Sequence, residues 1–151
     1  MKQANHEAFV RRAIALAGQG ALVERVRGPF GAVVVRHGEI VGEGCERAVP
    51  EHDPTWHAEV AAIRAACRRL ATPDLSGCVL HTCCERCPMC HAACWRARLD
   101  RMYYAATTDN IQTYTAVRGL RARAAWPLQP FRPFLTVTGV SMLREPARLT
   151  Y

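Results

Sequence analysis

Two kinds of segment alternate along this sequence, and their alternation limits the fold more than any other feature. Segments with apolar residues at helical spacing predict helices at about 6–17, 57–70, 88–98 and, more weakly, 109–120. Short apolar runs predict strands at 30–35, 39–44, 78–82, 101–106 and 134–140. Because helices that alternate with short buried strands cover the faces of a sheet, we expect a layered α/β fold.

Local signals place the ends of several of these elements. Asn5 can cap the first helix, and Gly18, Gly20, Gly28 and Pro29 are expected to end it. His37-Gly38 predicts a turn between the first two strands, which makes them a hairpin. The polar segment 46–54 reads as a loop that leads into the second helix.

The length and composition predict a single domain spanning residues 1–151. A chain of this size buries about two thirds of the surface of its unfolded state. Half of the residues are hydrophobic and 22% are charged, which excludes a disordered or collagen-like chain. No apolar run approaches the roughly 18 uncharged residues that cross a membrane. Glu7, Arg11 and Arg12 interrupt the N-terminus before a secretory signal could form, so we expect a cytoplasmic protein.

Eight cysteines and a formal net charge of +7 are the unusual features of the composition. Without an export signal, the cysteines are expected to be buried thiols, metal ligands or catalytic groups, and not disulfides. All basic residues except Lys2 are arginine, and they form no run longer than two. The charge is compatible with a nucleic-acid surface but does not establish one.

The sharpest pattern is His57-Ala58-Glu59, followed by Cys87-Pro88-Met89-Cys90. One imidazole and two thiolates are ligands that Zn²⁺ prefers, and three protein ligands leave a fourth tetrahedral position open, as in catalytic zinc sites. Cys87 stands where a helix cap belongs and Pro88 fits the first helical position. We therefore expect the N-termini of two helices to point at one metal ion, because a helix N-terminus also favours thiolates.

Glu59 is the expected proton carrier, because a carboxylate beside the metal can move a proton from water to a departing amine. The alternative is that Glu59 caps a solvated helix and that the cysteines are core thiols. A zinc-stabilised binding protein without catalysis is a further alternative, although a purely structural site has no use for this carboxylate.

Three stretches resemble the cytidine deaminase-like superfamily of zinc deaminases, namely Pro29–Val35, Asp53–Val60 and Cys87–Cys90. They are most similar to its guanine deaminase and tRNA adenosine deaminase branch. The resemblance covers about residues 5–109, and 133–143 is more faintly similar to the guanine deaminase tail. It implies a three-layer α/β/α sandwich with a mixed five-stranded sheet, a homodimer, and hydrolytic removal of an amine from a nucleobase.

The resemblance also implies roles for single residues. His57, Cys87 and Cys90 would bind Zn²⁺, Glu59 would shuttle the proton, and the backbone at Ala58 would help to hold the substrate.

Four aromatic residues are further candidates for substrate contact. Phe30 resembles the ring that lines the base pocket, with a core position as the alternative. Trp56 and Trp95 could line the same pocket, although aromatic residues near helix starts are more often core. Tyr151 resembles the C-terminal tyrosine with which the guanine deaminase branch can close a partner's active site.

Three departures from the family pattern affect the substrate. Arg86 replaces the usual proline before the first zinc cysteine, which removes a rigid turn but no ligand. Glu46 replaces the asparagine that reads the base, and a carboxylate only accepts hydrogen bonds whereas an amide also donates them. The acidic residue of guanine deaminases has no clear equivalent in 109–117.

We therefore expect a zinc-dependent aminohydrolase of a free nucleobase or a similar small amino-heterocycle. If Glu46 enters the pocket, it should favour a substrate edge with two N–H donors or a positive charge; the alternative is a solvated Glu46. A tRNA adenosine deaminase is the less favoured alternative, with the basic charge in its support.

Overall fold

Three helices and four strands make up the residues that this computed structural model describes, which are 5–22 and 29–106. In chain order they are α1 (His6–Leu22), β1 (Gly31–Arg36), β2 (Glu39–Cys45), α2 (Ala58–Leu70), β3 (Cys78–Cys84), α3 (Pro88–Arg96) and β4 (Arg101–Ala106). The alternation of helices and strands expected from the sequence is confirmed.

The strands form one mixed sheet in the order β2-β1-β3-β4. β1 pairs antiparallel with β2, as the predicted hairpin requires, and also antiparallel with β3. β3 and β4 are parallel, and α3 makes the crossover between them. The short segment after β3 leads directly into α3, so this helix begins near the C-terminal end of β3.

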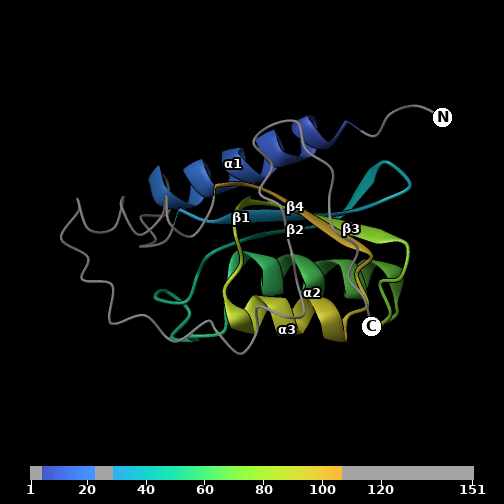
Figure 1. Ribbon diagram of the computed structural model, residues 1–151. Coiled ribbons are helices and arrows are strands. Elements are labelled where there is room, and N and C mark those ends of the chain that lie inside the picture. Colours follow the sequence, from blue (N-terminus) through green and yellow to red (C-terminus); the bar gives the residue numbers. More distant parts are fainter. Residues whose placement is uncertain (1–4, 23–28, 107–151) are drawn as a thin grey trace.

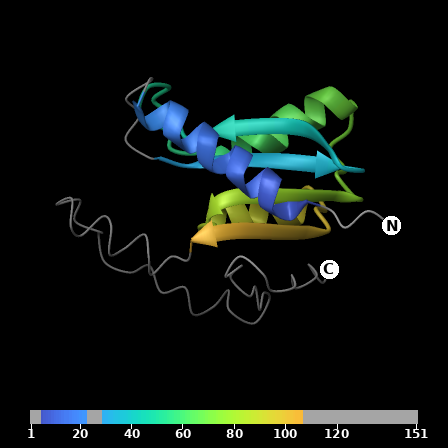
Figure 2. The ribbon, with the colours of Figure 1, turned by 90° about the horizontal axis from the view of Figure 1, so that it is seen from above.

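The helices cover both faces of the sheet. α1 lies on one face, whereas α2 and α3 lie side by side on the other (Figure 1). Figure 2, seen from the side of α1, shows that helix crossing over the strands. The three layers expected from the family resemblance are therefore present. Four strands are described, so the fifth is not confirmed.

A seam of small residues brings α2 unusually close to β2. A Cβ atom on Gly44 would lie 2.3 Å from the Ala58 carbonyl oxygen, and one on Gly42 would lie 2.4 Å from that of Ala62. Ala58, Ala62 and Ala66 are fully buried along the facing side of the helix. Any larger side chain in this seam would push the helix away, so the glycines fix where α2 begins.

The core and the α1 face use alternate residues of β3 and β4. Leu80 and Tyr104 belong to the buried cluster that also contains Ala62 and Ile63 of α2. His81 points to the opposite face, where its ring stacks with Tyr103 at a centroid separation of 5.1 Å. This alternation is what a sheet covered on both faces requires.

The structure differs from the sequence expectations at the first helix. The prediction that it ends at about residue 17, just before Gly18 and Gly20, was wrong, because α1 continues to Leu22. Ala13, Ala17 and Gly20 lie on its buried side. Packing against the sheet offsets the cost of about 1 kcal/mol that a helical glycine carries.

The remaining expected elements, the helix at 109–120 and the strand at 134–140, lie outside the described residues. No helix in the part of the chain that the structure describes is long and apolar enough to cross a membrane.

Candidate metal centre and active site

His57 and Cys87 occupy equivalent positions, each as the N-cap residue of a helix. Both have extended backbone angles, and neither side chain bonds to the backbone of its own helix. Pro88 takes the first position of α3, as the sequence predicted. The two ligand candidates are therefore free to point away from their helices, toward each other.

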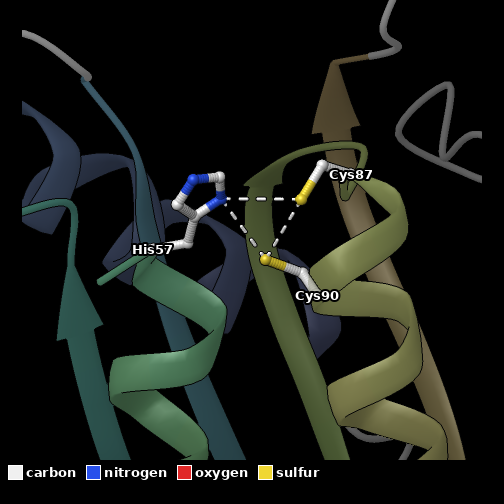
Figure 3. Close-up of side chains that lie close together, drawn as sticks. All are labelled: His57, Cys87 and Cys90. Carbon is white, nitrogen blue, oxygen red and sulfur yellow. Dashed lines mark hydrogen bonds between the residues drawn. The ribbon is translucent and has the colours of Figure 1, made fainter. Parts of the chain in front are cut away.

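His57, Cys87 and Cys90 form a compact triangle between the two helix ends (Figure 3). The His57 Nδ1 atom lies 3.6 Å from Cys87 Sγ and 3.5 Å from Cys90 Sγ, and the two sulfur atoms are 3.6 Å apart. Tetrahedral zinc with ordinary bond lengths sets edges of about 3.8 Å between two sulfurs and about 3.6 Å between sulfur and nitrogen. The donor set and its spacing therefore fit Zn²⁺.

The triangle already favours a negatively charged sulfur. The hydrogen bond between the Cys87 and Cys90 sulfurs, helped by one with His57, lowers the pKa of Cys87 to about 4. The same contact with Cys87 raises the pKa of Cys90, and the hydrogen bond with Cys87 raises the pKa of His57 to about 9. These pKa shifts describe a thiolate at Cys87 beside an imidazolium at His57. A bound metal cation would replace the protons that these groups share.

Glu59 faces this triangle from the first turn of α2. Its Oε2 atom accepts a hydrogen bond from the Cys90 thiol over 3.4 Å, and only 7% of the residue is exposed. Burial raises the pKa of its carboxyl group. A carboxyl group whose pKa is raised holds its proton more readily, which suits a group that accepts a proton and then delivers it.

Glu46 and Phe30 lie together at the ends of β2 and β1. The Glu46 backbone N–H donates to the Phe30 carbonyl oxygen over 3.1 Å. The Glu46 side chain is half-buried, and burial raises the pKa of its carboxyl group while the charge of His57 opposes that rise. Glu46 is therefore close enough to the triangle to interact with it electrostatically.

The other predicted substrate contacts have varied surroundings. Phe30 packs partly buried against the core, and Ala58 is fully buried with its carbonyl oxygen facing β2. Trp56 accepts a backbone hydrogen bond from Arg47, and its ring lies 5.8 Å below the guanidinium of Arg64.

Two predicted contacts are not brought to the triangle by the described structure. Trp95 is 52% exposed in the last turn of α3, at the opposite end of that helix from Cys87. Tyr151 lies outside the described residues.

Sequence reasoning missed the environment of Arg86. Only 9% of this residue is exposed, and its guanidinium contacts His91 Nδ1 and Met102 Sδ. The arginine next to a ligand was visible in the sequence as a departure from the family pattern, but its burial was not. The identity of its partners, however, depends on the packing of α3 against β4.

Comparison with known proteins decides the family. The model of the cytidine and deoxycytidylate deaminase zinc-binding region matches residues 3–106. The chain belongs to this family. Its zinc-binding character and the fit of the triangle agree on Zn²⁺ as the cofactor of this deaminase-family chain.

Relatives of the deaminase-family chain come from several groups. Guanine deaminase of Bacillus subtilis is 48% identical over 68% of this chain and 65% of its own length, so the match spans slightly less than two thirds of that relative. A crystal structure of that enzyme has a TM-score of 0.70 at 36% identity and covers 89% of this chain and 98% of its own.

Two further relatives have names that refer to transfer RNA. A tRNA-specific adenosine deaminase of Aquifex aeolicus is 38% identical over 62% of each chain. The tRNA(Ile)-lysidine synthase of Deinococcus radiodurans is 41% identical over 94% of this chain but only 23% of its own length.

Proposed function

We propose that this protein is a zinc-dependent hydrolytic deaminase of a free nucleobase or a related small amino-heterocycle. The observation that carries the proposal is the triangle of His57, Cys87 and Cys90 with the buried carboxyl group of Glu59 against it. Membership of the zinc-binding deaminase family and the similarity to guanine deaminase support the same reaction.

In this proposal His57, Cys87 and Cys90 hold the zinc ion. When bound, the metal supplies a water of lowered pKa, near 7 in well-studied zinc enzymes. Deamination forms a C–O bond from water, breaks the C–N bond to the amine and releases ammonia. A proton must therefore move from water to the departing nitrogen, and we propose that Glu59, which lies against the triangle, carries it.

Glu46 is the proposed determinant of substrate choice. Its Oε1 atom accepts the Ala48 N–H over 3.2 Å, and within the described residues its Oε2 atom has no hydrogen-bond partner. A half-buried carboxylate that only accepts hydrogen bonds favours a heterocycle presenting adjacent N–H donors or a positive charge. Diaminopurines and amino-rich pyrimidines or triazines have such an edge, and Phe30 and Trp56 are proposed to flank them.

An ammonia-release screen tests the function and the role of Glu46 together. The panel contains guanine, adenine, cytosine, isocytosine, diaminopurine, melamine-type triazines and creatinine. Zinc-loaded protein should release ammonia from at least one of them, and Glu46→Asn should change the order of preference. Glu51→Gln, on the same loop but in an exposed ion pair with Arg47, should leave the order unchanged. An identical profile for Glu46→Asn would remove Glu46 from the pocket.

A tRNA adenosine deaminase is the second candidate, favoured by the similarity to tRNA-specific adenosine deaminases and by the charge of +7. Binding of tRNA measured against salt concentration separates the two. A substrate surface for tRNA predicts tight binding whose logarithm falls steeply with the logarithm of salt, by about 0.7–0.9 per phosphate contacted. Weak binding to tRNA, together with turnover of a free base, would favour the small substrate.

A further inference from the structure

The segment between β3 and α3 carries a buried cation that the proposed chemistry does not use. The Arg86 guanidinium is the buried charge immediately before ligand candidate Cys87. Among the described residues no carboxylate lies within ion-pair distance of it. Burial lowers the pKa of Arg86, so its environment is unfavourable to a charge unless the donors are satisfied.

The contacts of Arg86 tie three elements together. Its Nε and Nη2 atoms donate to His91 Nδ1 over 3.1 and 2.8 Å, and its Nη1 atom donates to Met102 Sδ over 3.3 Å. His91 belongs to the first turns of α3, and Met102 is a buried residue of β4. One planar group thus links the chain before α3 to that helix and to the neighbouring strand.

The direction of the hydrogen bonds fixes the state of His91. A guanidinium has no acceptor atom, so Nδ1 must accept and His91 must be neutral with its proton on Nε2. Burial and the charge of Arg86 lower the pKa of His91 to about 4, which agrees with that state. His91 Nδ1 is therefore engaged by Arg86, and among the described residues the candidate metal ligands are His57, Cys87 and Cys90.

Main-chain hydrogen bonds also hold the backbone on both sides of Cys87. The His91 N–H donates to the Cys87 carbonyl oxygen over 3.0 Å, and the Glu85 N–H donates to the Ala106 carbonyl oxygen over 2.7 Å. The side-chain bridge from Arg86 to His91 closes a small ring around Cys87. Without this bridge, the segment that carries the first sulfur would lose its side-chain link to β4.

We propose that Arg86 is a positioning residue of the metal centre, which fixes the Cys87 sulfur by joining His91 and Met102 in one hydrogen-bonded bridge. This role concerns how tightly and in which geometry the ion is held. It does not depend on which heterocycle, or tRNA, is the substrate.

Zinc affinity, measured by competition with a chromophoric chelator, tests the proposal. Outer partners of metal ligands typically contribute 10–100-fold in affinity, so Arg86→Met and His91→Phe should each weaken zinc binding by about that factor. His91→Gln offers a neutral acceptor oxygen and should bind zinc within a few-fold of the unchanged protein. Arg96→Met, at an exposed arginine of the same helix, is the matched control and should have no effect.

Two further readouts distinguish a positioning role of Arg86 from an effect on the stability of the fold or of its charge alone. The visible spectrum of the Co²⁺-loaded protein should change in Arg86→Met and His91→Phe and not in Arg96→Met. Arg86→Lys keeps the charge but not the planar fork, and should resemble Arg86→Met.

Full affinity in Arg86→Lys, or unchanged zinc binding and Co²⁺ spectrum in folded His91→Phe, would overturn the proposal. If Arg86→Met does not fold, the comparison of His91→Phe with His91→Gln decides. Equal affinity in those two variants would also be a negative result.

Discussion

The N-cap residues of α2 and α3 are candidate metal ligands and not the residue types that usually cap a helix. N-cap positions favour serine, threonine, aspartate or asparagine, whose side chains stabilise a helix by about 1 kcal/mol relative to alanine. α2 and α3 have His57 and Cys87 there, and neither makes a capping hydrogen bond. Such conflicts between local preference and fold are expected at functional sites.

Glu59→Gln distinguishes an enzyme from a zinc-stabilised binding protein. The amide keeps the size of the side chain but cannot carry the proton, so kcat should fall by about 10²–10⁴-fold. The zinc content, determined by elemental analysis, should remain at the level of the unchanged protein, because Glu59 is not one of the proposed ligands. Undiminished turnover in Glu59→Gln would show that another group moves the proton.

At the scale of elements, the position of α2 on the sheet depends on the seam formed with Gly42 and Gly44. Both glycines would place a Cβ atom within 2.5 Å of helix backbone, so an alanine at either position forces a shift of the helix. Gly44 faces Ala58, next to His57, whereas Gly42 faces Ala62 and Ala66, farther along the helix. The two positions thus differ in how directly they act on the site.

Gly44→Ala and Gly42→Ala form a matched pair. Both should lower the free energy of unfolding by about 1–3 kcal/mol, the usual range for overpacking. Gly44→Ala should weaken zinc binding more, because it displaces the helix end that carries His57. Chemical denaturation of the metal-free proteins and zinc competition together measure the two effects. Equal zinc affinities in the two variants would show that the whole helix moves as a rigid body.

The sequence predicts these elements well where local patterns decide and poorly where packing decides. The spacing of His57, Cys87 and Cys90 and the proline at 88 were enough to predict converging helix ends. The length of α1 was missed because the low helix propensity of Gly18 and Gly20 predicts an end there. In the structure, packing against the sheet stabilises the helix beyond both glycines. The Arg86–His91 bridge depends on how α3 meets β4, which no local pattern contains.

At the scale of the whole molecule, α1 is attached to the sheet through a group of stacked rings. His6 Nδ1 lies 3.0 Å from His81 Nε2, and the His6 ring stacks on Tyr103 at 3.9 Å between centroids. His81 is 1% exposed, and within the described residues its Nδ1 atom has no hydrogen-bond partner. Burial, with a smaller contribution from His6, lowers the pKa of His81 to about 3.

This lowered pKa makes stability depend on pH. The unfolded chain binds a proton at residue 81 below about pH 6.5, whereas the folded protein does not until near pH 3. Stability is therefore complete above about pH 6.5 and falls as the pH drops toward 3. The loss at pH 4.5 is on the order of 3 kcal/mol.

His81→Gln removes the titration and should lose less stability than the unchanged protein between pH 7 and 4.5. Thermal unfolding of both metal-free proteins across that range measures the difference, and His52→Gln, at an exposed turn, is the control. Parallel pH curves for His81→Gln and the unchanged protein would mean that another group is responsible.

A metal ion bound between the two helix ends would also cross-link distant parts of the chain. His57 and Cys87 are 30 positions apart, so an ion held by both would close a loop that contains α2 and β3. A permanent cross-link over such a loop removes conformational entropy worth on the order of 3 kcal/mol from the unfolded chain. The metal would thus act as a reversible cross-link, and withdrawal of the ion would let α2 and α3 exchange their amide hydrogens together.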